Sequence, residues 1–483
     1  MGCLRVKACR GKVILMNEAL ALRVFVKPVF AQLIHSAAYE GPCRVGDKET
    51  LSPETERREG KKHFVQFYRE LEKSISPEAV LLKPTYIEWR DDWAIPEEEM
   101  RKLEPDIERA DLVLIAPSGL AQYPAIRIAE RYRKPVAMVG QVISVDMSAY
   151  LRSRGMEGYA LLDLDELNYL ISLLRVKKAI MNTRILIVTA GSLLPVGVVS
   201  SIWDLEAIKR RYGIDYKCIT ADEVFEEMDR VMKDDQRGRE AEKIADDLIK
   251  KAEKVHMSYE DILRSVYFYV AVKSLMTKYR CNAFTIPCFE ICARRIASKR
   301  KVTFCLTHTL LKDEGYPSAC EGDVSVLLAM MLLMYISRKS AYMGNSYVVD
   351  REKSIVALHH DVPGLKMKGL EGEELPYEIR NFTMEGWGAT IRYDFSRDRG
   401  EIVTLARFDP TGTRLLVTKG EIVGCEGFDE VGCRLRALIK VPDAVRLFHK
   451  EEEFGHHLAM VYGDYIRELK DLGKLMGFKV VEV

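Results

Sequence analysis

Apolar residues in the first third of the chain gather in short runs, separated by amphipathic stretches. LRVFVKPVF (22–30), DLVLIAP (111–117) and PVAMVG (135–140) are typical of buried strands. YPAIRIAERYRK, after the second run, and the leucine-rich segment 160–180 have the spacing of helices. Strands that alternate with helices indicate a parallel sheet with crossover connections. The sequence therefore predicts an N-terminal α/β domain over residues 1–180.

A second series of the same kind begins at RILIVTAGS (184–192). A helix (IWDLEAIKRRYG), a strand (IDYKCI) and a strand near NAFTIP follow it. The charged stretch 228–254 is predicted to be helical, with a solvated face or, alternatively, an oligomer contact. The series ends in VSVLLAMMLLMYI (324–336), which is apolar but shorter than the roughly 20 residues of a bilayer span. We interpret that run as a core helix and predict a second α/β domain over residues 181–344.

The pattern changes after residue 345. SIVALHH, GATIRYDF, EIVTLARF, TRLLVTKGEIVG and RLRALIKV are short β-type segments with glycine, aspartate and proline between them. A helix at 464–476 and the strand FKVVEV close the chain. The expected fold is therefore two Rossmann-like parallel α/β domains followed by a C-terminal β-barrel-like domain over residues 345–483.

Composition excludes some classes of partner. The 483 residues are 48% hydrophobic and 30% charged, and 73 basic against 72 acidic residues leave a net charge of +1. Without a basic surplus we expect neither nucleic acid nor a membrane as partner. No signal peptide is predicted, and eleven cysteines without a CxxC pair indicate reduced thiols, so we expect a cytoplasmic protein. The true start is Met1 or a residue near Met16.

The stretch GYPSACEGD (315–323) places two acids directly before the apolar run. Ser318 and Glu321 have the spacing of a capping box, which would explain Glu321 without any function. A helix start is also a rigid place for a functional carboxylate, so both interpretations stand. Asp323 either faces a site or stabilises the helix N-terminus through the backbone dipole.

Four of the nine histidines form two doublets, His359-His360 and His456-His457. The first follows a predicted strand, and Gly455 before the second allows a tight backbone. Imidazole together with carboxylate suits a mixed nitrogen and oxygen site for manganese or a similar divalent ion. The residues alone therefore indicate a metal site between an α/β unit and a β-domain.

The segment CFEICARRIASKRKVTFCLTHTLLKDEGYPSACEGDVSVLLAMMLLMYI resembles the core of the L-fucose isomerase and L-arabinose isomerase superfamily. YMGNSYVVDREKSIVALHHDVPG, FGHHLAMVYGDYIREL and RILIVTAGSLLPVGVVSS are similar to other motifs of that family, in the same order over 184–483. The resemblance implies an aldose–ketose isomerase that acts on a pentose or (deoxy)hexose through a cis-enediol. It also implies Mn²⁺ (alternatively Co²⁺ or Mg²⁺) and a homotrimer or homohexamer with the active site at a subunit boundary.

Four site residues follow from matching positions. Glu321 matches the glutamate that is both metal ligand and acid/base, and His457 matches the ligand histidine. His359 matches a histidine that binds metal in the arabinose isomerase branch, while His360 stands where many relatives have cysteine. Asn345 stands where the second metal carboxylate and proton-transfer group should be. An amide can bind metal through oxygen but cannot act as a base.

The resemblance assigns supporting roles to other residues. Asp323, Glu290 and His456 are candidates for residues behind the ligands, where they would orient them. Glu290 stands where relatives carry an acid, and the alternative for it is a partly buried helix acid. Ser118 and Gly119 follow a strand in the N-terminal domain and would either meet an anion or form a plain turn. Related proteins often have a glycine-threonine-glutamate loop where this chain has Ser118 and Gly119. This difference and Asn345 leave two alternatives open: a non-catalytic sugar-binding paralogue, and an enediolate-type lyase on a sugar derivative.

Overall fold

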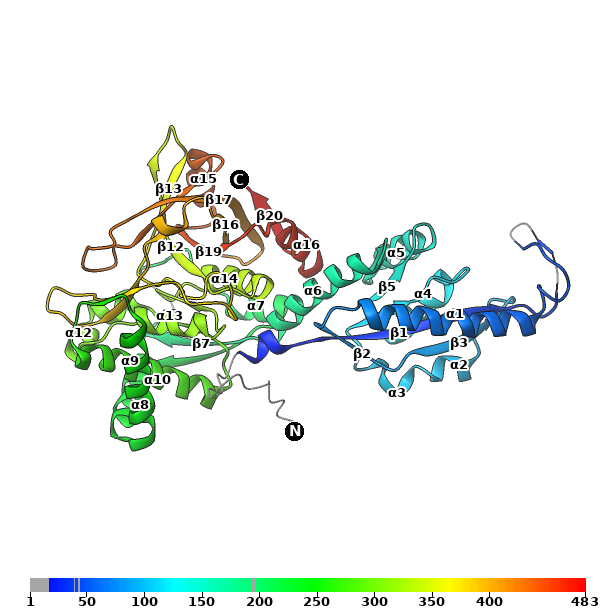
Figure 1. Ribbon diagram of the computed structural model, residues 1–483, viewed down its shortest axis with the longest axis horizontal. Helices are drawn as coiled ribbons and strands as arrows, with labels where there is room; N and C mark the ends of the chain where they lie inside the picture. The colour runs from blue at the N-terminus through cyan, green and yellow to red at the C-terminus, as the bar shows by residue number, and fades with distance from the viewer. Residues whose placement is uncertain (1–16, 39, 42–43, 193–196) are drawn as a thin grey trace. The chain divides into compact units, whose positions relative to one another are not determined.

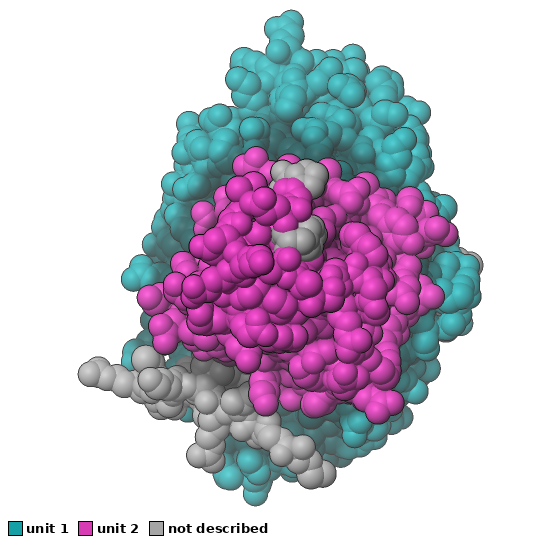
Figure 2. All heavy atoms as spheres, turned by 90° about the vertical axis from the view of Figure 1, so that its right-hand side faces the viewer, with its two compact units in different colours: residues 1–21, 176–483 teal, residues 22–175 magenta. Residues whose placement is uncertain are grey.

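The computed structural model describes residues 17–38, 40–41, 44–192 and 197–483, drawn as a ribbon in Figure 1. They form two compact units, coloured in Figure 2: residues 22–175 make the smaller one, and residues 176–483 with those described before 22 make the larger one. Among the described residues, no helix combines the length and the apolar character that a bilayer crossing requires.

The smaller unit is built on a six-stranded parallel sheet. Its longest strand, β1 (Val24–Ile34), pairs with two short strands on one side and with β4 on the other. The other strands are β2 (Ala79–Leu81), β3 (Thr85–Arg90), β4 (Leu112–Ile115), β5 (Val136–Val139) and β6 (Gly158–Leu161). All four residues of β4 are buried, as expected for a parallel sheet covered on both faces. The covering helices include α1 (Pro53–Ser74), α4 (Gln122–Tyr132) and α5 (Ile143–Ser153).

The larger unit begins with the end of α6 (Leu164–Met181) and a second parallel sheet. Its strand order is β11 (Ser318–Ala319), β10 (Ala283–Thr285), β7 (Arg184–Thr189), β8 (Asp215–Thr220). The helices that follow these strands in the described residues are α7 (Leu205–Tyr212), α8 (Ala221–Lys233), α9 (Asp235–Lys251), α10 (Tyr259–Tyr279), α11 (Cys288–Ala293), α12 (Ile296–Arg300), α13 (Cys305–Asp313) and α14 (Val324–Ser337). Because parallel strands end at one edge, the segments after β7, β10 and β11 come together there.

The C-terminal part of the larger unit is a closed antiparallel barrel. Its strand order is β16 (Ile402–Phe408), β19 (His457–Tyr462), β12 (Tyr342–Asp350), β13 (Ile355–His359), β18 (Arg436–Lys440), β17 (Arg414–Glu426), and β17 pairs back with β16. β20 (Lys479–Glu482) joins β17 in parallel, after α15 (Ala444–Glu451) and α16 (Ile466–Met476). Side chains such as Tyr342, Leu358 and Met460 fill the interior. α14 lies against the outside of β16 and β19.

The predicted fold class is confirmed: parallel α/β sheets come first and a barrel closes the chain. The predicted domain boundaries at 180 and 344 stay predictions, since the compact units divide once, between 175 and 176. A smaller sheet, β15 (Ala389–Arg392), β14 (Glu378–Asn381) and β9 (Lys254–Val255), was not predicted.

The charged stretch 228–254 is helical over most of its length, as predicted, and is divided in two. Asp234 ends α8 and caps α9, where its Oδ1 accepts hydrogen bonds from the backbone of Gln236 and Arg237. The predicted capping box was wrong: Ser318 lies in β11, and Asp323 is the N-cap of α14.

Candidate active site

Glu321 lies in the short connection between β11 and α14. Its backbone is left-handed, with φ of +60°, and Gly322 follows with φ of +67°. A left-handed conformation is uncommon for a residue other than glycine, and it is held here by the tight connection between the strand and the helix. The tight turn presents the Glu321 side chain at the edge where the parallel strands end.

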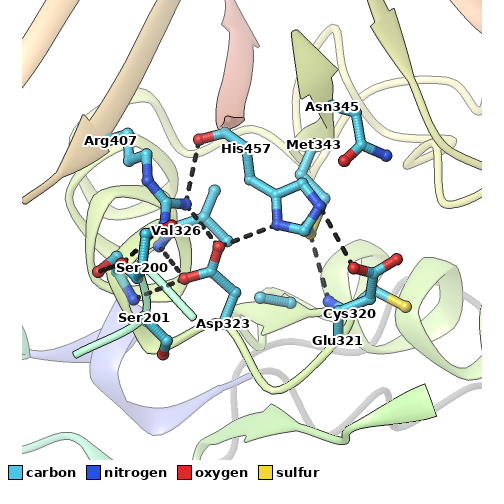
Figure 3. A network of polar contacts seen from close by, with 12 residues as sticks. Ser200, Ser201, Cys320, Glu321, Asp323, Val326, Met343, Asn345, Arg407 and His457 are labelled. Carbon is cyan, nitrogen blue, oxygen red and sulfur yellow. Dashed lines mark hydrogen bonds and ion pairs between the residues drawn. The ribbon is translucent and has the colours of Figure 1, made fainter. Parts of the chain in front are cut away.

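Asp323 performs two tasks at the start of α14. Its Oδ1 accepts hydrogen bonds from the backbone N–H of Ser325 (3.0 Å) and Val326 (3.2 Å), which caps the helix. Its Oδ2 accepts from Nδ1 of His457 at 2.9 Å and pairs with the guanidinium of Arg407, and all three side chains are fully buried (Figure 3). Burial opposes ionisation, but Arg407 and His457 hold the pKa of Asp323 well below its usual value.

Two histidines from different strands turn toward Glu321. His457, the first residue of β19, places Nε2 3.6 Å from Oε2 of Glu321. His360, just after β13, places Nε2 3.3 Å from Oε1. Both Nε2 atoms are buried and lack a hydrogen-bond partner among the described residues. The ligand atoms of the three residues all lie within 4.8 Å of one another.

The other ring nitrogen of each histidine is held from behind. Nδ1 of His457 contacts Asp323, and Nδ1 of His360 lies 3.4 Å from Sγ of Cys433. Metal-binding histidines commonly have such a partner, because it fixes the ring orientation and the tautomer. Burial opposes ionisation of Glu321, but the neighbouring His360 and, to a smaller extent, His457 lower its pKa to about 2. The cluster thus places a readily ionised carboxylate 3.3 Å and 3.6 Å from two imidazole Nε2 atoms.

The segment before His457 comes unusually close to Arg407. Gly455 has a φ of +107°, and a Cβ at this position would stand 2.2 Å from Oγ of Ser200 and 2.7 Å from a guanidinium nitrogen of Arg407. Arg407 also donates to the carbonyl oxygens of Phe454 (2.6 Å) and His457 (3.2 Å). Only glycine fits there, as the sequence indicated.

Two further predicted site residues, His359 and Asn345, form contacts of their own. His359 faces outward from the barrel two strands away from His457, and its Nε2 contacts the carbonyl oxygen of Cys433. His360, the residue that follows β13, lies in the cluster with Glu321 and His457, and His359 does not. The metal-ligand role of these residues stays a prediction. Asn345 pairs in register with both His359 and His457, and its Nδ2 donates to the carbonyl of His359 at 3.2 Å. Figure 3 shows it beside the ring of His457 on the side away from Asp323.

The three remaining candidates, Glu290, His456 and Ser118, differ in their surroundings. Glu290, on α11, accepts a hydrogen bond from the backbone N–H of Gly197 at 3.1 Å. His456 is exposed beside His457, with ring centroids 4.5 Å apart; partial burial and the charge of His457 lower its pKa to about 4. Ser118, in the smaller unit, donates to the carbonyl of Ala31 at 2.6 Å, which fits the plain turn.

Sequence reasoning missed Arg407 and Cys433 altogether. Arg407 lies within an ordinary barrel strand and Cys433 in a loop, so neither stands near a motif. For His360 the doublet was a signal, but it could not tell which histidine turns inward. In both doublets the second histidine joins the cluster.

Comparison with known proteins gives a consistent but distant result. No family model matches the chain. A protein named sulfoquinovose isomerase from Alkalicoccus urumqiensis is 28% identical over 232 residues, which are 46% of this chain and 49% of that protein. Proteins of the same name from Priestia aryabhattai and Priestia megaterium are each 24% identical over 323 residues, 64% of this chain and 66% of theirs. The matches span between about half and just under two thirds of these relatives. Membership of the fucose and arabinose isomerase superfamily stays a prediction.

Proposed function

We propose that this protein is an aldose–ketose isomerase that uses a divalent metal ion held by Glu321, His360 and His457. The carrying observation is the pair of buried Nε2 atoms, both without a hydrogen-bond partner in the described chain and both turned to an ionised carboxylate. Two imidazoles and a carboxylate suit Mn²⁺, with Co²⁺ or Mg²⁺ as alternatives. The similarity to proteins named sulfoquinovose isomerase supports the reaction class.

The residues fit the chemistry of moving a hydrogen between neighbouring carbons. A divalent ion, when bound, polarises the substrate carbonyl and stabilises the negative charge that develops on its oxygen. Glu321 is ionised and stands at the cluster, so its carboxylate accepts the proton from C2 and returns it to C1. Asp323 and Cys433 keep the two rings in place. Asn345 carries no proton in this scheme.

For the substrate we propose an aldose with an anionic group at the far end, as in sulfoquinovose, a sulfonated hexose. Arg294 is exposed, lies one helical turn beyond Glu290 on α11, and forms no ion pair with any acid in the described part of the chain. Its guanidinium lies against Gly191, at the edge where β7 ends. A guanidinium binds a sulfonate through paired hydrogen bonds. Arg294→Met should raise KM for sulfoquinovose at least tenfold and leave KM for D-glucose unchanged, whereas Lys299→Met should change neither.

We also propose a homotrimer or homohexamer in the cytoplasm, with the active site at a subunit boundary. Large apolar side chains are exposed near the candidate site: Val199 is 74% and Phe289 59% exposed. Exposed apolar groups of this size are common at interfaces. Light scattering of the purified protein tests the assembly, and a monomer at micromolar concentration would contradict it.

The proposed activity is tested by metal content and turnover together. The purified protein should contain close to one divalent ion per chain and convert sulfoquinovose, or another aldose in a panel with L-fucose, L-arabinose and D-glucose, to its ketose. Glu321→Gln should abolish turnover, while Glu373→Gln, which removes an exposed carboxylate, should not. The second candidate, a non-catalytic sugar-binding paralogue, is favoured by the amide at Asn345. It would bind a sugar without product from any member of the panel.

A further inference from the structure

Glu290 lies near the cluster, and only one of its two carboxylate oxygens has a hydrogen-bond partner among the described residues. Oε1 accepts the hydrogen bond from Gly197, whereas Oε2 is shielded from solvent and has no partner in the described part of the chain. An unpaired buried oxygen of this kind is unfavourable in itself, and a catalytic role or a bound molecule is one physical reason for it. α11 follows β10, so the side chain comes from the same sheet edge as Glu321.

Gly197 lies between the carboxylates of Glu290 and Glu321. Its N–H donates a hydrogen bond to Oε1 of Glu290, and a Cβ on Gly197 would stand 3.7 Å from Oε2 of Glu321. With ordinary backbone dimensions these contacts hold the two carboxylates within about 9 Å of each other. Carboxylates roughly 5–9 Å apart are the arrangement with which other enzymes act on a sugar from two sides. Gly197 adds no side chain between them, and a Cβ there would already contact Phe289 at 3.4 Å.

Isomerisation moves two protons, and one carboxylate does not serve both equally well. The hydrogen on C2 goes to C1, while the proton of the C2 hydroxyl must leave O2 and another must reach O1. Glu321 is placed for the carbon-bound proton. The amide of Asn345 cannot take up a proton at neutral pH. The oxygen-to-oxygen transfer therefore lacks a carrier among the residues expected from the sequence.

We propose that Glu290 is a second catalytic residue, which carries the proton between O2 and O1 of the substrate. Oε2 accepts the proton from the O2 hydroxyl as that oxygen becomes the ketose carbonyl, and the same proton is delivered to O1. Atoms and charge balance without a further reactant. The proposal rests on the isomerase function above, and it assigns to α11 the role that Asn345 cannot fill.

Glu290→Gln tests this role cleanly because a glutamine amide oxygen can still accept the hydrogen bond from Gly197. We expect kcat for the best substrate of the panel to fall at least 100-fold, with KM within threefold of wild type and metal content unchanged. Oxygen-to-oxygen transfer should then limit the rate, so the kinetic isotope effect of C2-deuterated substrate should fall and the solvent isotope effect should rise. Glu290→Asp, which keeps a carboxylate, should recover part of kcat.

Glu260→Gln is the matched control, since it removes an exposed acid from the first turn of α10 and should leave all these values unchanged. Wild-type turnover with an unchanged kcat in Glu290→Gln would overturn the role of Glu290 alone. A lower kcat with metal loss, unchanged isotope effects and no recovery in Glu290→Asp would also overturn it, since this pattern describes a structural residue. If the wild-type protein isomerises no aldose, both the function and this role fall.

Discussion

At the scale of single residues, Asp323 is the most heavily used side chain of the site. It caps α14, orients His457 and neutralises Arg407, and all of these contacts are buried. Asp323→Asn would leave the Arg407 charge without a counter-charge, so we expect the free energy of unfolding to fall by about 3–5 kcal/mol. Chemical denaturation measures this loss.

The control is Asp229→Asn, which breaks the exposed ion pair with Arg300. Exposed pairs contribute under about 1 kcal/mol. Equal losses of unfolding free energy in the two variants would mean that the buried Asp323–Arg407 pair stabilises the fold no more than the exposed pair does.

Glu451 should make the free energy of unfolding depend on pH. This residue of α15 is 8% exposed, and burial raises its pKa to about 8, with partial opposition from Ser346 and Arg407. The folded state then keeps a proton that the unfolded chain loses near pH 4.5, so stability falls as pH rises from about 4.5 to 8. Glu451→Gln should remove up to about 1.4 kcal/mol of this loss per pH unit. Urea titrations at pH 5 and pH 8 measure it, and an equal effect of the substitution at both values would show that Glu451 is ionised when folded.

The sequence predicted some site residues better than others. Glu321 and His457 stand in motifs whose order along the chain is informative, and both lie in the cluster. The exchange of His359 for His360 could not be foreseen, because it depends on where β13 ends and the chain turns. Arg407 and Cys433 act through contacts that join distant segments, and such contacts leave no local pattern.

At the scale of elements, the site depends on how closely the segment before β19 approaches β16. Gly455→Ala would force a methyl group into Arg407 and Ser200 and would strain a backbone with φ of +107°. We expect the unfolding free energy to fall by more than about 1 kcal/mol and metal affinity to fall with it, because Arg407 holds Asp323 behind His457. Thermal unfolding with and without Mn²⁺ measures both effects.

Gly238→Ala is the matched control, since this glycine lies within α9 with open space around it. There the substitution should stabilise the protein by up to about 1 kcal/mol. Destabilisation of similar size at both positions would contradict the close-approach argument.

The elements themselves were largely predictable, for a physical reason. Strand and helix periods are local, so the α/β series and the β-rich end could be foreseen from residues such as those of β4 and α14. Closure of the barrel depends on β17 pairing back with β16, and the small sheet joins β9 to β14 over a long separation. Asp234, which interrupts a continuous helical pattern, shows how one capping side chain overrides periodicity.

At the scale of the whole molecule, metal binding should stabilise the folded chain. The ligands come from the α/β part through Glu321 and from the barrel through His360 and His457, so an ion would hold these parts together. Free Mn²⁺ at 100 times Kd should add about 2.7 kcal/mol to the unfolding free energy. His360→Ala should lose this gain, whereas His359→Ala, its neighbour in the doublet, should keep most of it. If His359→Ala lost the stabilisation by Mn²⁺ and His360→Ala kept it, His359 would be the ligand, as expected from the sequence.

We propose above that Glu321, His360 and His457 form a catalytic metal centre for aldose–ketose isomerisation. The most direct test is ketose formation from sulfoquinovose and the other aldoses by metal-free protein, before and after Mn²⁺ is added back. We predict no detectable product before addition and full turnover after it. Undiminished turnover in the metal-free protein, or no product from any aldose with Mn²⁺ bound, would contradict the claim.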